Sequence, residues 1–176
     1  MPKIYNQEQL HSIRECLIRQ GREYFEAFGY KRTSIDELSR TCGITKSTFY
    51  RLFNGKEDFF ISILDRIEDE MQTDIREAVM RLRDKPRQAL KEIIRKGMHT
   101  FETNAIMRML LDPAFFQMIS RHMSETGFSL GLQKDNELAS FILQTFGAQI
   151  REIPPEQLTG MLRALFFLPI HKKEIG

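Results

Sequence analysis

The chain has 176 residues, of which 41% are hydrophobic and 28% are charged, and its formal net charge is +2. This composition argues against a disordered chain and against a membrane-embedded one, and the length suits one substantial domain or two joined domains. No apolar run is long enough to span a bilayer, and the polar amino terminus does not resemble a secretory signal. We therefore expect a cytoplasmic protein with no membrane partner.

Positive charge gathers at the amino-terminal end of the chain. Residues 1–56 hold ten Lys or Arg against six Asp or Glu, whereas residues 57–176 hold sixteen against eighteen. Within the basic end, residues 29–56 carry six basic and two acidic groups. Such a local excess is typical of phosphate-binding surfaces, and an ordinary solvated basic face is the alternative.

Cys16 and Cys42 are the two cysteines of the chain. No Cys or His cluster at metal-ligand spacing accompanies them, which argues against a zinc site and against a disulfide framework. We interpret both as small buried apolar residues rather than as redox groups. We expect no metal and no cofactor.

The first two predicted helices lie close together in the sequence. Apolar residues at three- and four-residue steps predict a helix over residues 7–28, which Gly29 ends. Ser34 and Glu37 then form a capping-box pattern that predicts the start of a second, short helix. Gly43 ends this helix, because glycine adopts a left-handed turn at little cost.

A third predicted helix follows directly, capped by Thr45 and covering about residues 46–52. Two short helices joined by a glycine turn form a helix-turn-helix, which needs another helix behind it to bury its shared apolar face. The first turn of the third helix is polar, so its side chains are free to reach base edges in a DNA major groove. An ordinary capped helix is the alternative interpretation.

The rest of the chain predicts further helices and no strands. We assign residues 124–136 to a loop, because this stretch has several polar or glycine positions and no clean period. No segment shows the sustained alternation of a β-strand. The remaining predicted helices cover about residues 56–84, 86–104, 113–123, 136–149 and 156–168. The expected fold class is therefore all-α.

The segment FEAFGYKRTSIDELSRTCGITKSTFYRLFNGKEDFF, residues 25–60, resembles the DNA-binding domain of the TetR family of bacterial transcriptional regulators. The resemblance covers about residues 10–60. Its matching positions are Phe25, Gly29, Tyr30, Thr33, Gly43, Tyr50, Phe53 and Lys56. It implies a homodimer that binds a palindromic double-stranded DNA operator, with a carboxy-terminal helical domain for dimerisation and ligand binding.

The resemblance also implies roles for individual residues. The side chains that look like base readers lie in the first turn of the third helix and are Lys46, Ser47 and Thr48. Phosphate contacts are expected from groups on the flanking segment, namely Thr33, Thr45, Tyr50, Arg51 and Lys56. Ser47 stands where the family often has a smaller residue, so base contact and simple packing both remain open for it.

We expect a helix-turn-helix domain over residues 1–55 and a helical ligand-binding and dimerisation domain over residues 56–176. The long fourth helix joins the two domains. The tail after Pro169 has the character of a loop rather than of a finished helix, which is compatible with a missing final helix.

The carboxy-terminal domain is rich in Met and Phe, which line adaptable apolar cavities and also fill helical cores. Over residues 99–119, polar side chains stand among these apolar ones, a pattern that suits either ligand orientation or surface ion pairs. We expect a small apolar or aromatic ligand. The candidate pocket residues are Met98, Phe101, Glu102, Met107, Phe115, Phe116 and Met118.

Apolar stripes on the last two predicted helices are the expected dimer interface, as in a four-helix bundle across a two-fold axis. Packing inside one subunit is the alternative. The interface candidates are Leu138, Phe141, Ile142, Phe146, Leu158, Met161, Leu162 and Leu165.

These features predict a sequence-specific transcriptional regulator, a repressor that a small, largely apolar ligand releases from its operator. The alternative keeps DNA binding and uses the carboxy-terminal domain only to dimerise or to dock a protein partner. An enzyme is not expected, because the chain has no glycine-rich phosphate loop, no metal-spaced His/Cys set and no evident partner for its four histidines.

Overall fold

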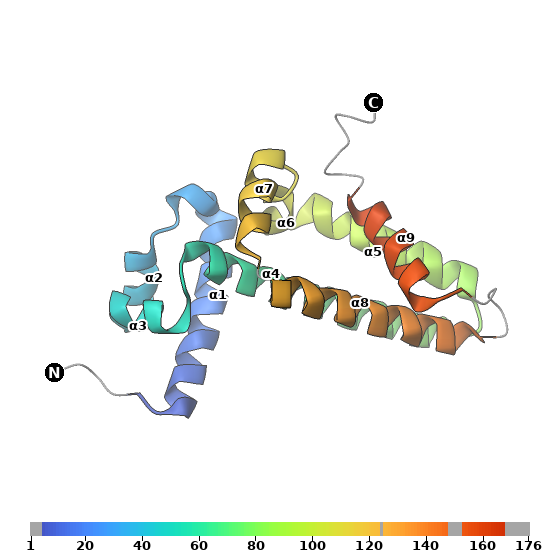
Figure 1. The fold of residues 1–176 in the computed structure, drawn as a ribbon, viewed down its shortest axis with the longest axis horizontal. Coiled ribbons are helices and arrows are strands. Elements are labelled where there is room, and N and C mark those ends of the chain that lie inside the picture. The colour runs from blue at the N-terminus through green and yellow to red at the C-terminus, as the bar shows by residue number, and fades with distance from the viewer. Residues whose placement is uncertain (1–4, 124, 148–152, 168–176) are drawn as a thin grey trace. The chain divides into compact units, whose positions relative to one another are not determined.

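The computed structural model describes residues 5–123, 125–147 and 153–167, leaving aside the side chains of residues 125–130 and 165–167. Within these residues every regular element is a helix, which confirms the all-α prediction (Figure 1). None of the described helices combines the length and the apolar character needed to cross a bilayer.

The described helices form two compact units, Met1–Arg66 and Ile67–Gly176. The boundary between the units lies inside the fourth helix, whereas the sequence predicts a domain boundary at the start of that helix; the predicted division of functions stays a prediction. The predicted helix ends at 149 and 168 and the tail after 169 lie outside the described residues.

In chain order the helices are α1 (Gln7–Arg32), α2 (Ile35–Thr41), α3 (Lys46–Leu52), α4 (Lys56–Arg81), α5 (Pro86–Thr103), α6 (Ala105–Met109), α7 (Pro113–His122), α8 (Glu125–Phe146) and α9 (Pro155–Phe167).

Local signals fix the ends of the first helices. Asn6 Oδ1 accepts a hydrogen bond from the backbone N–H of Gln9 at 2.8 Å, and Gln9 Oε1 accepts one from the N–H of Asn6 at 2.9 Å, so α1 starts with a capping box. Its helical geometry breaks at Gly29, whose φ is 74°, as the sequence predicts. The capping box predicted at Ser34 is wrong, because Ser34 is the N-cap of α2 but its side chain makes no capping hydrogen bond.

An aromatic cluster holds α1, α3 and α4 together at the centre of the first unit. The ring of Phe59 on α4 lies 5.9 Å from that of Phe25 on α1 and 5.3 Å from that of Phe49 on α3, measured between centroids. Phe53, the C-cap of α3, lies 4.9 Å from the same ring. Phe25, Phe49 and Phe59 are fully buried, and burial of each such ring stabilises the fold by about 2–3 kcal/mol.

Gly21 on α1 makes this close approach possible. A Cβ atom at this position would overlap Cζ of Phe59 and would lie 2.8 Å from Cδ1 of Ile63. Because a side chain here would push α4 away, the packing of α1 on α4 depends on a glycine.

Cys16 on α1 and Cys42, the C-cap of α2, form a disulfide, with their Cα atoms 6.1 Å apart. Both side chains are only partly buried. The interpretation of the cysteines as buried apolar residues is therefore wrong. Cysteines 26 positions apart do not themselves indicate that α1 meets the end of α2, so their spacing could not reveal the bond. A bridge that closes a loop of this length stabilises a fold by about 3 kcal/mol in the chain-entropy account.

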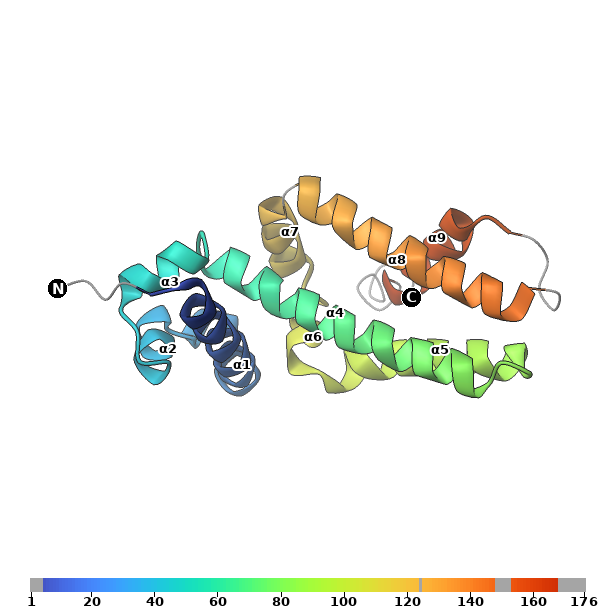
Figure 2. The same cartoon turned by 90° about the horizontal axis from the view of Figure 1, so that it is seen from below.

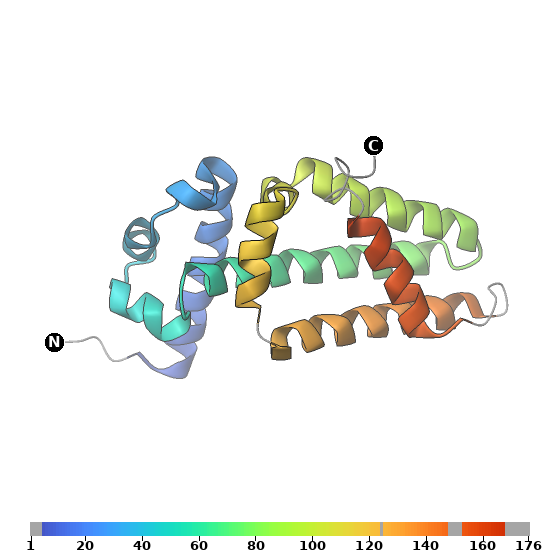
Figure 3. The same ribbon diagram turned by 45° about the horizontal axis from the view of Figure 1, so that its top comes forward.

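In the second unit, the carboxy-terminal part of α4 packs with α5 and α8, which run side by side with it in Figures 2 and 3. α9 adds partly buried leucines to the same core. The buried residues of this cluster are Ile75, Val79, Ala89, Ile93, Leu138, Ile142 and Phe146.

Three residues predicted for a dimer interface belong to this internal core. Leu138 is 6% exposed, Ile142 is 4% exposed and Phe146 is 2% exposed. Their apolar stripe on α8 packs against α4 and α5 within the subunit, so the interface prediction is wrong for these three side chains.

The other interface candidates keep different amounts of free surface. Phe141, Leu158 and Leu162 are partly buried against the same cluster. Met161 is 58% exposed and stays available for contact with another molecule. Leu165 lies outside the described side chains.

The loop predicted over residues 124–136 is wrong from residue 125 onward, because α8 begins there. Polar side chains of this segment pair with α4. Lys134 Nζ donates to Asp69 Oδ1 at 2.7 Å, and Gln72 Nε2 donates to Asp135 Oδ1 at 3.1 Å. These tertiary contacts stabilise the helix although its sequence has no clear apolar period.

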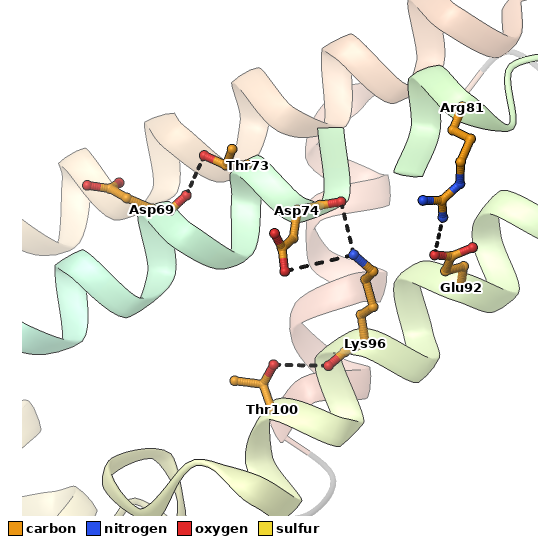
Figure 4. Close-up of polar contacts among 7 residues, drawn as sticks. All are labelled: Asp69, Thr73, Asp74, Arg81, Glu92, Lys96 and Thr100. Atoms are coloured by element: carbon orange, nitrogen blue, oxygen red, sulfur yellow. Dashed lines mark hydrogen bonds and ion pairs between the residues drawn. The ribbon is translucent and has the colours of Figure 1, made fainter. Parts of the chain in front are cut away.

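Ion pairs also tie α4 to α5 (Figure 4). Lys96 Nζ lies 3.8 Å from Oδ2 of Asp74, and Arg81 donates a hydrogen bond to Glu92. That hydrogen bond lowers the pKa of the Glu92 carboxyl below its usual value. Exposed pairs of this kind contribute little to stability, so the apolar cluster dominates the association of these helices.

We predict that Gly21→Ala destabilises the first unit by about 2 kcal/mol, because the added methyl group must displace the ring of Phe59. Urea unfolding followed by circular dichroism measures the change. The matched control is Gly160→Ala, since a Cβ at this exposed position of α9 would have no atom within 4 Å. The control should be neutral or stabilising by up to about 1 kcal/mol. Wild-type stability in Gly21→Ala would contradict the described packing.

Candidate nucleic-acid interface

A short turn joins α2 to α3 (Figure 1), and backbone hydrogen bonds and one left-handed residue define it. The N–H of Gly43 donates to the carbonyl of Arg40, and the N–H of Ile44 donates to the carbonyl of Ser39, both at 3.0 Å. Gly43 has a φ of 66°, a conformation that favours glycine. Leu38 is fully buried beside this turn, so the predicted helix-turn-helix is present and packed.

α3 has a buried face and an exposed face. Thr48 and Phe49 are buried, and Leu52 is partly buried. The exposed side chains follow the spacing i, i+1, i+4 and i+5, which places them on one stripe of the helix. We call this stripe the outer face of α3, and it consists of Lys46, Ser47, Tyr50 and Arg51.

Lys46 on the outer face pairs with Asp36 in the first turn of α2. Lys46 Nζ lies 3.2 Å from Oδ1 and 3.3 Å from Oδ2 of Asp36. The side chains are 53% and 58% exposed, so the pair is well hydrated and weak. Nothing in the sequence indicates that the Asp36 carboxylate faces Lys46, so this pair could not be predicted from it. Because the pair is weak, the Lys46 ammonium can exchange Asp36 for another acceptor at little cost in free energy.

Thr48 does not belong to the exposed set. Its side chain is 5% exposed, and its hydroxyl forms a hydrogen bond with Thr45 Oγ1 at 3.0 Å. The prediction that Thr48 reads bases is wrong for this structure, because position 48 falls on the face of α3 that packs against the core.

Thr33 is likewise buried. Its side chain is 3% exposed, and its hydroxyl donates to the carbonyl of Gly29 at 2.9 Å. The prediction that this hydroxyl binds phosphate does not fit, because it serves to satisfy the backbone at the end of α1.

Thr45 and Ser47 form the polar start of α3. Thr45 is the N-cap, and its Oγ1 accepts from the N–H of Thr48 at 3.4 Å. Its hydroxyl also lies 2.8 Å from Ser47 Oγ. Ser47 is exposed, so of the two roles left open by the sequence, packing does not apply.

Lys56 stands at the start of α4 beside a tyrosine. Its Nζ lies 4.6 Å from the ring centroid of Tyr30, in a cation–π contact, and the Tyr30 hydroxyl donates to Glu57 Oε1 at 2.7 Å. Burial lowers the pKa of Lys56, and the charge of Glu57 opposes this effect. Burial, and then the hydrogen bond to Glu57, raise the pKa of Tyr30 well above its usual value. The contacts hold the Lys56 stem at a defined place next to the helix-turn-helix.

The candidate ligand-pocket residues fall on α5, α6 and α7 in varied environments. Phe101 is 7% exposed and Met98 is 38% exposed, whereas Glu102 is an exposed carboxylate. Asn104, which lies between α5 and α6, caps α6. Its Oδ1 accepts hydrogen bonds from the N–H groups of Ile106 and Met107, so this oxygen already has two donors. The other candidates are partly buried and are Met107, Phe115, Phe116 and Met118.

A surface pocket of about 530 Å³ lies along α8. None of its lining residues is a predicted ligand-pocket residue, so the location of a ligand stays a prediction. The lining residues are Leu132, Gln133, Asn136, Glu137, Ser140, Phe141 and Gln144. In the part of the chain that the structure describes, no group of three His, Cys, Asp or Glu side chains is placed to hold a metal ion.

Residues 17–63 match the family model of bacterial regulatory proteins of the tetR family. The chain is 30% identical over 63 residues to the HTH-type transcriptional regulator TcmR of Streptomyces glaucescens, a match covering 36% of this chain and 28% of that protein. It is 29% identical over 66 residues to the uncharacterized HTH-type transcriptional regulator YhgD of Bacillus subtilis, covering 38% of this chain and 35% of that protein. These matches span about a third or less of the relatives' length.

Solved structures share the fold over nearly the whole chain. A TetR-family transcriptional regulator from Pectobacterium atrosepticum superposes with a TM-score of 0.68 at 17% identity, covering 94% of this chain and 86% of that one. The reduced form of NemR from E. coli gives a TM-score of 0.62 at 21% identity, covering 94% and 89%. The likeness extends the shared helical fold beyond the matched amino-terminal segment.

We predict that Thr48→Val lowers the free energy of unfolding by about 1 kcal/mol, because it removes a buried hydroxyl that pairs with Thr45. Ser47→Ala is the control, and this exposed substitution should stay within about 0.5 kcal/mol of wild type. Urea unfolding measures both variants. If Ser47→Ala were the more damaging change, the assignment of the two faces of α3 would be reversed.

Proposed function

We propose that this chain, whose segment 17–63 belongs to the TetR family of bacterial regulatory proteins, is a sequence-specific regulator of transcription that binds double-stranded DNA. This family consists of transcriptional regulators rather than enzymes. The observation that carries the proposal is the outer face of α3, which presents two cations, a hydroxyl and a phenol to solvent while Phe49 anchors the helix from behind. Donors of these types suit base edges and phosphates.

The structure supports an assignment of base-reading and phosphate-binding residues that differs from the one the sequence predicts. We assign base reading to Lys46 and Ser47, which lie at the exposed start of α3. We assign phosphate binding to groups that flank this start, namely Thr45, Tyr50, Arg51 and Lys56. In this assignment, Lys46 leaves Asp36 when an acceptor on a base takes the place of the carboxylate. The negative charge of Asp36 also repels a phosphate that lies in the wrong place.

The finer features of the proposal follow the family. A homodimer would place two copies of α3 in successive major grooves of a palindromic operator, with half-sites about 34–36 Å apart. Exposed Met161 on α9 is a candidate contact of such a dimer. Such a protein works in the cytoplasm, where bacterial DNA lies.

We propose repression with release by a small apolar or aromatic ligand bound in the carboxy-terminal unit. α4 supports this coupling, because one continuous helix starts at Lys56 and extends past the unit boundary. A ligand shifts the equilibrium only as far as its affinity differs between two conformations. The alternative is a regulator whose carboxy-terminal unit only dimerises or docks a protein.

The proposed function is tested by selecting duplexes from a random pool with the full-length protein and measuring affinity by fluorescence anisotropy at several salt concentrations. Lys46→Ala should cost about 1–3 kcal/mol on the selected duplex and relax the preference at one position. Lys56→Ala should weaken selected and random duplexes alike and reduce the salt slope by about 1.

Lys91→Ala is the matched control, because Lys91 is an exposed lysine on α5 in the other unit. It should leave affinity, preference and slope unchanged. A selection that yields no enriched sequence, or equal losses in all three variants on every duplex, would overturn the assignment.

The ligand hypothesis predicts that small apolar molecules which displace a hydrophobic dye from the protein also weaken binding to the selected duplex. Dye fluorescence and anisotropy on the same samples measure both effects. Molecules that bind while duplex affinity stays constant would favour the alternative, a carboxy-terminal unit without a sensing role.

A further inference from the structure

The Cys16–Cys42 disulfide has no part in the DNA contacts assigned above, yet it lies inside the helix-turn-helix unit. It joins the middle of α1 to the residue that ends α2. Gly43 follows Cys42 directly, and α3 begins at Lys46. The bond therefore fixes the turn that sets where α3 begins.

Other contacts hold the same turn without the sulfur atoms. Leu38 is fully buried and Ile44 is 9% exposed, so α2 and the turn keep an apolar anchor. The hydroxyls of Tyr24 on α1 and Thr41 on α2 lie 3.1 Å apart in an exposed hydrogen bond. Because these contacts do not depend on the disulfide, the unit can fold in the dithiol form, with a less constrained turn.

Two features suit a bond that forms and breaks. The Cα–Cα distance of 6.1 Å lies within the range of native disulfides, so the backbone of the folded unit accommodates the bond. Neither cysteine is fully buried, and partial exposure favours access of small oxidants and reductants to the bond. A buried structural cystine would lack this access.

The cellular compartment expected for a DNA-binding regulator also favours a reversible disulfide, and this step rests on the proposed function. A regulator that binds DNA works where thiols are kept reduced, and disulfides in such places are mostly transient or redox-sensing. A disulfide next to the reading helix is therefore better explained as a sensor than as a permanent staple.

We propose that Cys16 and Cys42 form a reversible dithiol–disulfide site whose oxidation by a peroxide locks the α2–α3 turn and strengthens DNA binding. One thiol gives up its proton and the thiolate attacks a peroxide oxygen. The O–O bond breaks, a sulfenic acid forms, and the leaving hydroxide takes up the released proton as a first water. The second thiol attacks the sulfenic sulfur, the S–S bond forms, and a second water leaves. The two thiols lose two electrons and two protons, and hydrogen peroxide is reduced to two waters.

The first experiment needs no DNA. The full-length protein is reduced, exposed to hydrogen peroxide, alkylated and digested, and the Cys16 and Cys42 peptides are measured by mass spectrometry. We expect an intramolecular disulfide that an excess of reduced glutathione with glutaredoxin reverses in the native protein. Independent oxidation of the two cysteines, or a bond that resists this reduction until the protein unfolds, would refute a reversible site.

The second experiment compares amide hydrogen exchange in the two forms. Residues 35–52 should exchange several-fold faster in the dithiol form, whereas the second unit should not change. Cys16→Ser and Cys42→Ser should behave like the reduced wild type under both conditions. Equal exchange in oxidised and reduced wild type would refute the locking of the turn, whether or not the variants fold.

DNA binding is measured last, with the duplex selected by the full-length protein. The oxidised form should bind about fivefold more tightly than the reduced form, because a pre-ordered turn loses less freedom on binding. Equal affinities would refute the coupling while leaving the redox site in place. Failure of both forms to select any duplex would instead refute the proposed function, and the first two experiments would still decide the redox chemistry.

Discussion

The structure of the amino-terminal unit depends on one close contact, the ring of Phe59 against the bare backbone at Gly21. From that position Phe59 also touches the rings of Phe25 on α1, Phe49 on α3 and Phe53, the C-cap of α3. A seven-residue helix such as α3 is not stable alone in water, so its position comes from this packing. The contact thereby fixes the helix that presents the proposed reading residues.

The same packing sorts the polar residues of α3 into two groups. Inward polar groups satisfy each other, as Thr48 does with Thr45, and they stabilise the unit rather than meet a ligand. Outward groups are left with weak partners, as Lys46 is with Asp36. When the basic side chains of a surface have only weak partners and the backbone beneath them is rigid, these side chains can readily exchange a carboxylate partner for DNA.

Much of the fold follows from short-range signals in the sequence. Apolar periods, Gly29, Gly43 and the Thr45 cap predict the helix-turn-helix because each acts within one turn of chain. Features that depend on contacts between distant segments could not be predicted in this way. They include the Cys16–Cys42 disulfide and the helical state of residues 125–136. The burial of Thr48 depends on the exact rotation of α3, which a first-turn pattern does not define.

The proposed function requires that the outer faces of two α3 helices enter the major groove as a matched pair. Dimethyl sulfate footprinting on the selected duplex tests it most directly, since the reagent methylates guanine N7 in the major groove and adenine N3 in the minor groove. The proposed binding mode predicts protection of N7 in two clusters about one helical turn apart, related by two-fold symmetry. Protection of adenine N3 alone, or a single cluster without a symmetric partner, would contradict it.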